Sequence, residues 1–129
     1  MAVAQVVLDT DVVVDFLRGH GPGVEGVRQM VREGRALVSA VTVYELGQGA
    51  LTSEDQAAVE LFCRSRTLSF TSQAAMRAGE LAAELRASGT PIGTADTLIA
   101  GLCLHHGCGL MTKNTRHFNR VTALELVPT

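Results

Sequence analysis

The most constraining feature of this sequence is a short apolar run, residues 3–8, that stops abruptly at Asp9. Because polar residues do not alternate with apolar ones in this run, we predict a strand buried on both faces, as in a parallel sheet. Further strands are predicted at residues 36–40, 67–70, 110–112 and 123–127. Helical patterns separate them at residues 11–17, 24–33, 42–50, 53–64, 72–87 and 94–106. Strands that alternate with helices predict an α/β fold with a mainly parallel sheet. Two helices follow each other before the fourth strand, and both cannot pack along the sheet, so residues 72–87 are expected to run partly off it.

Length and composition predict one domain with a well-buried core. The chain has 129 residues, of which 47% are hydrophobic and 19% charged, so residues 1–129 are expected to form a single unit. A net charge of −2 gives no general attraction to nucleic acid, which would need a local basic patch. Three cysteines without paired spacing argue against a disulfide framework and fit a reducing compartment. Without a signal peptide or an apolar stretch of about 20 residues, we expect a cytoplasmic protein that does not enter the membrane.

Four polar residues are expected to meet at one edge of this sheet. Asp9 follows the first strand, Glu45 lies about one turn into the helix after the second strand, and Asn114 follows the fourth strand. Asp96 begins the helix that returns to the fourth strand, with Thr94 as its expected cap. Sites in parallel sheets form at the carboxyl ends of the strands. Carboxylates rarely crowd together unless a cation compensates them, so the pattern predicts a divalent metal site.

The ligand types indicate which ion and which reaction. Oxygen ligands favour Mg²⁺, or Mn²⁺, over Zn²⁺. Such an ion joins carboxylates to phosphate and activates water, which suits hydrolysis of a phosphodiester. The hydroxyls of Thr10 and Thr112 are candidates for positioning water or phosphate. A basic cluster near the same edge is the candidate contact for a nucleic-acid backbone, and it comprises Lys113, Arg116 and Arg120, with His117 beside them.

Each of the four site residues also has a simpler structural interpretation. Asp9 and Asn114 are common turn residues. Asp96 would favour a helix N-terminus through the helix dipole alone. Glu45 stands three residues after Thr42, the spacing of a capping box. The joint pattern nevertheless favours the metal site, because these interpretations do not explain why all four residues fall at one edge.

Other polar residues favour ordinary structural roles. Asp11 and Asp15 lie one helical turn apart, a spacing typical of a solvated helix face. A zinc site is disfavoured because its four candidate ligands match no standard finger spacing and one of them falls on an apolar helix stripe; they are Cys103, His105, His106 and Cys108.

Three segments carry a resemblance to a known family. They are VVLDTDVVVDFLRG at residues 6–19, SAVTVYELGQGA at residues 39–50, and PIGTADTLIAGLCLHHGCGLMTKNTRHFNRV at residues 91–121. In this order and spacing the chain resembles a PIN-domain ribonuclease of the VapC toxin type over essentially its whole length. The resemblance implies a three-layer α/β/α sandwich with a short five-stranded sheet and a metal-dependent endoribonuclease. It also implies a homodimer and a cognate antitoxin that blocks the site.

The same resemblance assigns metal-binding roles to Asp9, Glu45 and Asp96, and a site role to Asn114. Two positions depart from the family pattern. Asn114 stands where the wider family has a fourth acid, and a neutral amide weakens any second metal site. Asp11 stands where Asn or Ser is frequent, and the sequence leaves open whether it adds negative charge or caps the next helix.

Two other functions remain as alternatives. Residues 6–13 resemble the first motif of haloacid-dehalogenase-like phosphatases, with Asp9 as nucleophile and Asp11 as acid and base. Those enzymes also need a lysine followed by an acidic pair, whereas Lys113 is the only lysine here and Glu125 the only acid after it. The second alternative is a binding module that kept the fold and lost catalysis, suggested by Asn114 and by the lack of a general basic field.

Overall fold

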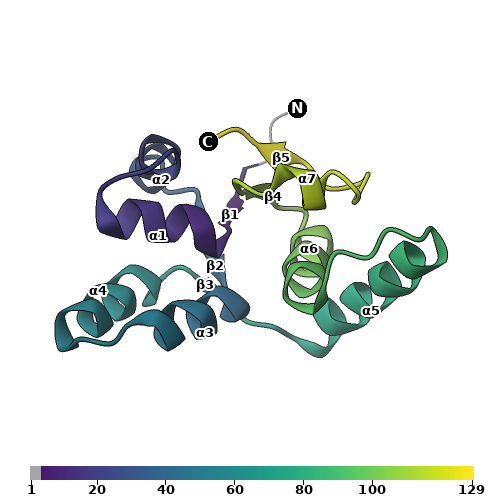
Figure 1. The fold of residues 1–129 in the computed structure, drawn as a ribbon, viewed down its shortest axis with the longest axis horizontal. Helices are drawn as coiled ribbons and strands as arrows, with labels where there is room; N and C mark the ends of the chain where they lie inside the picture. Colours follow the sequence, from purple (N-terminus) through teal and green to yellow (C-terminus); the bar gives the residue numbers. More distant parts are fainter. Residues whose placement is uncertain (1–3) are drawn as a thin grey trace.

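A computed structural model describes residues 4–129 as a parallel sheet between two layers of helices (Figure 1). The predicted strand at residues 3–8 is observed as β1 (Val6–Leu8), and Val3 lies outside the described residues. The other strands are β2 (Ala36–Ser39), β3 (Thr67–Leu68), β4 (Gly109–Met111) and β5 (Leu126–Val127). They lie in the order β3-β2-β1-β4-β5, and every neighbouring pair is parallel. The predicted five-stranded parallel sheet is therefore confirmed.

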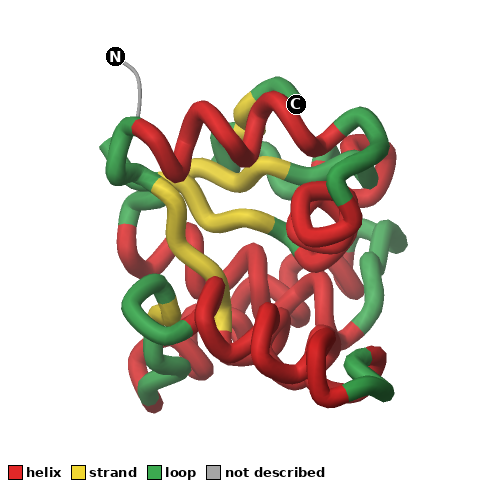
Figure 2. The backbone as a smooth tube through the Cα atoms, turned by 90° about the vertical axis from the view of Figure 1, so that its left-hand side faces the viewer, coloured by secondary structure: helices red, strands yellow, loops and turns green. Residues whose placement is uncertain are grey.

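Successive residues of β1 face opposite sides of the sheet, and this alternation explains the two helix layers. Val6 and Leu8 pack into one buried cluster, whereas Val7 packs into the other. The first cluster is covered by α1 (Thr10–Arg18), α2 (Gly23–Arg32), α3 (Ala40–Gly49) and α4 (Ser53–Cys63). The second is covered by α5 (Ser72–Ala87), α6 (Thr94–His106) and α7 (Thr115–Phe118). Figure 2 shows the strands enclosed by helices, which confirms the three-layer α/β/α architecture.

The position of α5 resolves the problem of the two successive helices before β4. This helix packs mainly on α6 and lies outside it relative to the sheet (Figure 1). The two helices come unusually close because Gly101 has no side chain: a Cβ atom there would lie 2.5 Å from the Cβ of Ala78. The expectation that residues 72–87 leave the sheet is therefore confirmed.

The predicted helix starts were partly wrong. α3 begins two residues before Thr42, because Ser39 is its N-cap and accepts a hydrogen bond from the backbone N–H of Thr42 at 3.0 Å. The capping box between Thr42 and Glu45 therefore does not form. α6 has Gly93 as its N-cap and no side-chain cap, so Thr94 is the first helical residue and not the cap. No helix within residues 4–129 is both long and apolar enough to cross a membrane.

Candidate metal site

Asp9 is the buried centre of the site. It leaves β1 in an extended conformation and caps α1. Its two carboxylate oxygens accept hydrogen bonds from the backbone N–H of Thr10 at 2.8 Å and from the hydroxyl of Thr112 at 2.7 Å. Burial raises the pKa of Asp9 to about 6; the bond from Thr112 opposes this rise, and repulsion from Asp11 and Asp96 adds to it. A buried carboxylate near two others is the environment that a cation stabilises.

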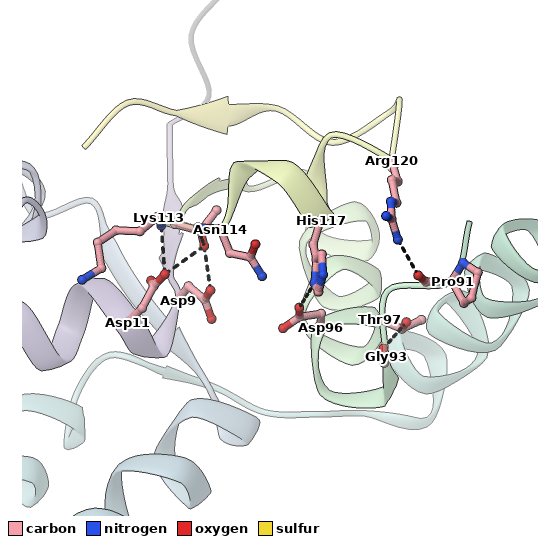
Figure 3. A network of polar contacts seen from close by, with 11 residues as sticks. Asp9, Asp11, Pro91, Gly93, Asp96, Thr97, Lys113, Asn114, His117 and Arg120 are labelled. Atoms are coloured by element: carbon pink, nitrogen blue, oxygen red, sulfur yellow. Dashed lines mark hydrogen bonds and ion pairs between the residues drawn. The ribbon is translucent and has the colours of Figure 1, made fainter. Parts of the chain in front are cut away.

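Asp96 approaches Asp9 from the opposite side of the sheet. It lies in the first turn of α6, and its Oδ2 atom is 3.2 Å from Nδ1 of His117. Figure 3 shows Asp9 and Asp96 on either side of Asn114, whose side chain projects between them. Asp96 is near enough to Asp9 to raise the pKa of that carboxyl through repulsion. The structure therefore brings together three of the four predicted residues: Asp9, Asp96 and Asn114.

Glu45 reaches the same edge but contacts a neighbour of Asp9. Its Oε1 atom accepts a hydrogen bond from the hydroxyl of Thr10 at 2.6 Å, and the Thr10 hydroxyl is also 3.0 Å from that of Thr42. No three Asp, Glu, His or Cys side chains among residues 4–129 are grouped so that they could hold one ion. Glu45 is thus adjacent to the pair formed by Asp9 and Asp96 without completing a set of three ligands with them.

The residues present suit a hydrated ion better than a fully protein-coordinated one. Asp9, Asp96 and Asn114 offer carboxylate and amide oxygens, the ligand type of Mg²⁺ and Mn²⁺, and Mg²⁺ usually keeps several of its waters. The Oδ1 atom of Asp11 is buried and has no hydrogen-bond partner among residues 4–129. Asp11 therefore has an unpaired acceptor, and the pKa of the nearby Asp9 is raised. Both features suit a site in which a cation or its waters would be stabilising. The donor set therefore fits a divalent cation.

Two of the three basic residues predicted to bind phosphate are engaged within the chain. The Nζ atom of Lys113 lies 2.9 Å from a carboxylate oxygen of Asp15. Arg120 donates a hydrogen bond to the backbone carbonyl of Pro91 at 2.7 Å, just before α6 (Figure 3). Arg116 is exposed, and its side chain makes no hydrogen bond or ion pair with any other residue in the range 4–129. Of the predicted basic cluster, only Arg116 is therefore free to meet a ligand.

Sequence reasoning missed the structural importance of Asp15. It is buried, with 8% of its surface exposed, and does not belong to a solvated helix face. The backbone N–H of Gly23 and the ammonium of Lys113 hold the pKa of Asp15 below its ordinary value. Asp11 accepts a hydrogen bond from the backbone N–H of Lys113 at 3.0 Å, and burial raises its pKa. The available signal was the position of Asp15 inside an apolar helix together with the presence of a single lysine in the chain.

The four residues considered as zinc ligands lie in two different environments. Cys103 and Cys108 are free, buried thiols, and burial raises the pKa of each. His105 and His106 are exposed, and their rings pack edge to face with centroids 4.8 Å apart.

Comparison with known proteins identifies a consistent set of relatives. A family model described as PIN domain matches residues 6–124. The tRNA(fMet)-specific endonuclease VapC of Shigella flexneri is 34% identical over 122 residues, which cover 91% of this chain and 92% of the relative. Ribonuclease VapC1 of Haemophilus influenzae (strain R2866) is 32% identical over 125 residues, with 92% of each chain covered. In the crystal structure of DNA-bound VapBC from Salmonella typhimurium, a chain 30% identical to this one superposes with a TM-score of 0.84 and 98% coverage of both chains.

Proposed function

This chain belongs to the PIN-domain family, and from that premise we propose that it is a metal-dependent endoribonuclease that acts as the toxin of a toxin–antitoxin pair. The observation that carries the proposal is the pairing of buried Asp9 with Asp96 beside Asn114, in a fold whose similar proteins are named ribonucleases. The nuclease class comes from these relatives. The use of Mg²⁺ or Mn²⁺ is our inference from the oxygen donors and from the electrostatics of Asp9.

Each residue at the edge has a defined task in this proposal. Asp9 and Asp96 would hold the ion directly, with Glu45 and Asn114 acting through its waters. When bound, a divalent ion supplies Lewis acidity that activates water and neutralises charge on the phosphate. Thr112 keeps the Asp9 carboxylate in place through its 2.7 Å hydrogen bond.

The neighbouring contacts support this division of roles. The Thr10 hydroxyl donates a hydrogen bond of 2.6 Å to the Glu45 carboxylate and so orients it. His117 fixes the Asp96 carboxylate from above α6 (Figure 3). Arg116, as the free cation of the predicted cluster, is the residue that would contact the RNA phosphates.

The remaining expectations extend the proposal to partners. By resemblance to VapC toxins, we propose a cytoplasmic homodimer and an antitoxin protein that covers the site. A candidate surface for such contacts is formed by three exposed apolar side chains. They are Tyr44 on α3, Leu51 just after it and Leu61 on α4. Sedimentation of the purified chain at micromolar concentration should show a dimer, and a monomer only would contradict this part.

Cleavage of defined RNA tests the proposal. The first substrate to try is tRNA(fMet), because the Shigella flexneri relative is named for it. Cleavage should need Mg²⁺ or Mn²⁺ and stop with EDTA. Asp9→Asn and Asp96→Asn should each lower the rate by more than the roughly 10- to 100-fold expected when an outer-sphere partner is lost. Glu54→Gln, an exposed change on α4, should leave the rate unchanged. Cleavage that survives EDTA and both site variants would refute the proposal.

A binding module without catalytic activity is the second candidate. It is favoured by one observation: within residues 4–129, no three potential ligands are grouped to hold an ion. This candidate predicts RNA or antitoxin binding without cleavage at any metal concentration, so the same experiment separates the two functions.

A further inference from the structure

The loop of residues 112–114, which follows β4 and carries Asn114, is fixed to the site by short polar contacts. The hydroxyl of Thr112 donates to Asp9 at 2.7 Å and accepts a hydrogen bond from the backbone N–H of Asn114 at 3.0 Å. The backbone N–H of Lys113 donates to Asp11 at 3.0 Å. Each residue of the loop is therefore bound, directly or through its neighbour, to the first turn of α1 or to its cap (Figure 3).

A partly buried ion pair anchors the same loop one helical turn further along α1. The Nζ atom of Lys113 lies 2.9 Å from one carboxylate oxygen of Asp15 and 3.0 Å from the other. The side chain of Asp15 is 11% exposed and that of Lys113 is 34% exposed. Solvent screens such a pair less than one on the open surface, so its geometry is better defined.

The turn between α1 and α2 is built around the Asp15 carboxylate. The backbone N–H of Gly23 donates to Asp15 at 2.9 Å. Gly21 has a φ of +124°, and a Cβ atom at this position would lie 2.4 Å from Cγ of Asp15. Only glycine allows the backbone to come so close, so the α1–α2 turn holds the Asp15 carboxylate in addition to its pair with Lys113.

From these contacts we propose that Asp15 and Lys113 are positioning residues, whose ion pair fixes the 112–114 loop so that Thr112 and Asn114 stand beside Asp9. This inference rests on the proposed function in one respect, namely that Asp9 and Asn114 belong to the metal site. It reassigns Lys113, which the sequence favoured as a phosphate contact. A phosphate would have to compete with the largely buried Asp15 carboxylate for this ammonium, and weakening a buried ion pair is costly.

Matched variants separate positioning from phosphate binding. Lys113→Met removes the ammonium, and Lys113→Arg keeps a cation that can still pair with Asp15. Asp15→Asn removes the charge but retains an oxygen that can accept the hydrogen bond from the backbone N–H of Gly23. The turn between α1 and α2 can therefore keep its structure in this variant. Arg116→Met removes a free cation from the same segment, and Arg86→Met removes an exposed one from the end of α5.

Hydrogen exchange of backbone amides gives a readout that does not depend on activity. The proposal predicts that Lys113→Met and Asp15→Asn each accelerate exchange at position 113 and at Asn114 by about tenfold or more, while the amide of Val13 in the core keeps its rate. Lys113→Arg should restore most of the protection. Unchanged exchange at both loop amides, or equal acceleration at Val13, would overturn the proposal.

Steady-state kinetics supply the second readout. Lys113→Met should lower kcat by about tenfold or more with little change in KM, as expected when an outer partner of a metal site is lost. Arg116→Met should instead raise KM and reduce its salt dependence, and Arg86→Met should change neither. A Lys113→Met variant that behaves like Arg116→Met, with unaltered loop exchange, would show that Lys113 binds phosphate. If the unaltered protein cuts no RNA, the proposed function fails, whereas the exchange rates still decide whether the ion pair positions the loop.

Discussion

Replacing Asp9 by asparagine should stabilise the metal-free protein at neutral pH, although it should abolish activity. Burial raises the pKa of Asp9 to about 6 from its ordinary value of 3.8. Between these two values the folded protein binds more protons than the unfolded chain, so Asp9 makes stability fall as pH rises through this window. The full penalty is present above about pH 6. A difference of about two pH units, at about 1.4 kcal/mol each, corresponds to about 3 kcal/mol.

Urea denaturation in EDTA, followed by circular dichroism, measures this penalty. Asp9→Asn should be more stable than the unaltered protein by up to about 3 kcal/mol at pH 7.5 and by about half of that at pH 5.0. Excess Mg²⁺ should stabilise the unaltered protein and leave the variant unchanged, because ligand binding to the folded state alone adds stability. Glu54→Gln, which alters an exposed carboxyl, serves as the control. A variant that is less stable at pH 7.5, or whose advantage is the same at both pH values, would show that the Asp9 carboxylate carries no such penalty.

Three further variants test Thr112, the contact between α5 and α6, and Arg120. Thr112→Val removes a hydrogen bond that lowers the pKa of Asp9, so the acid limb of the pH profile of kcat should move to higher pH. An unmoved limb would mean that the titration of Asp9 does not produce it. Gly101→Ala places a Cβ 2.5 Å from that of Ala78 and should lower stability by about 1–3 kcal/mol in thermal denaturation, whereas an unchanged midpoint would mean that α5 can move outward freely. Arg120→Ala removes the bond to the carbonyl of Pro91, which lies just before α6, the helix that carries Asp96. This variant should therefore weaken Mn²⁺ binding measured by calorimetry without changing RNA affinity. The reverse result would make Arg120 an RNA contact.

The sequence predicted the elements whose pattern is governed by burial. The continuous apolar run that ends at Leu8 gave the central strand, because both faces of β1 are buried. The bounds of α5 were predicted correctly, since its buried residues recur at helical spacing and Ser72 opens the helix behind its cap. These features depend on local periodicity, which a sequence displays directly.

Contacts between distant segments were not predictable in the same way. The start of α3 was misplaced because both Ser39 and Thr42 are good caps, and only the fold shows that Ser39 accepts the hydrogen bond. Lys113 and Asp15 are 98 residues apart, so the sequence could indicate that Asp15 needs a partner but only the fold brings the two side chains together. The short helix α7 was missed because its four residues carry no periodicity.

The candidate site shows the same division. Its location at the carboxyl ends of the strands followed from the order of strands and helices, and Asp9, Asp96 and Asn114 meet there (Figure 3). The individual contacts did not follow, since Glu45 binds Thr10 and does not join the two aspartates as a third ligand. Side-chain partners at a crowded edge depend on tertiary packing, whereas the choice of edge depends only on topology.

The most direct test of the metal site is the anomalous diffraction of crystals soaked in Mn²⁺. We expect one strong peak between the carboxylates of Asp9 and Asp96, beside the amide of Asn114, and the loss of that peak in Asp96→Asn. Manganese bound elsewhere, or no peak between these two carboxylates at a Mn²⁺ concentration that supports RNA cleavage, would contradict it.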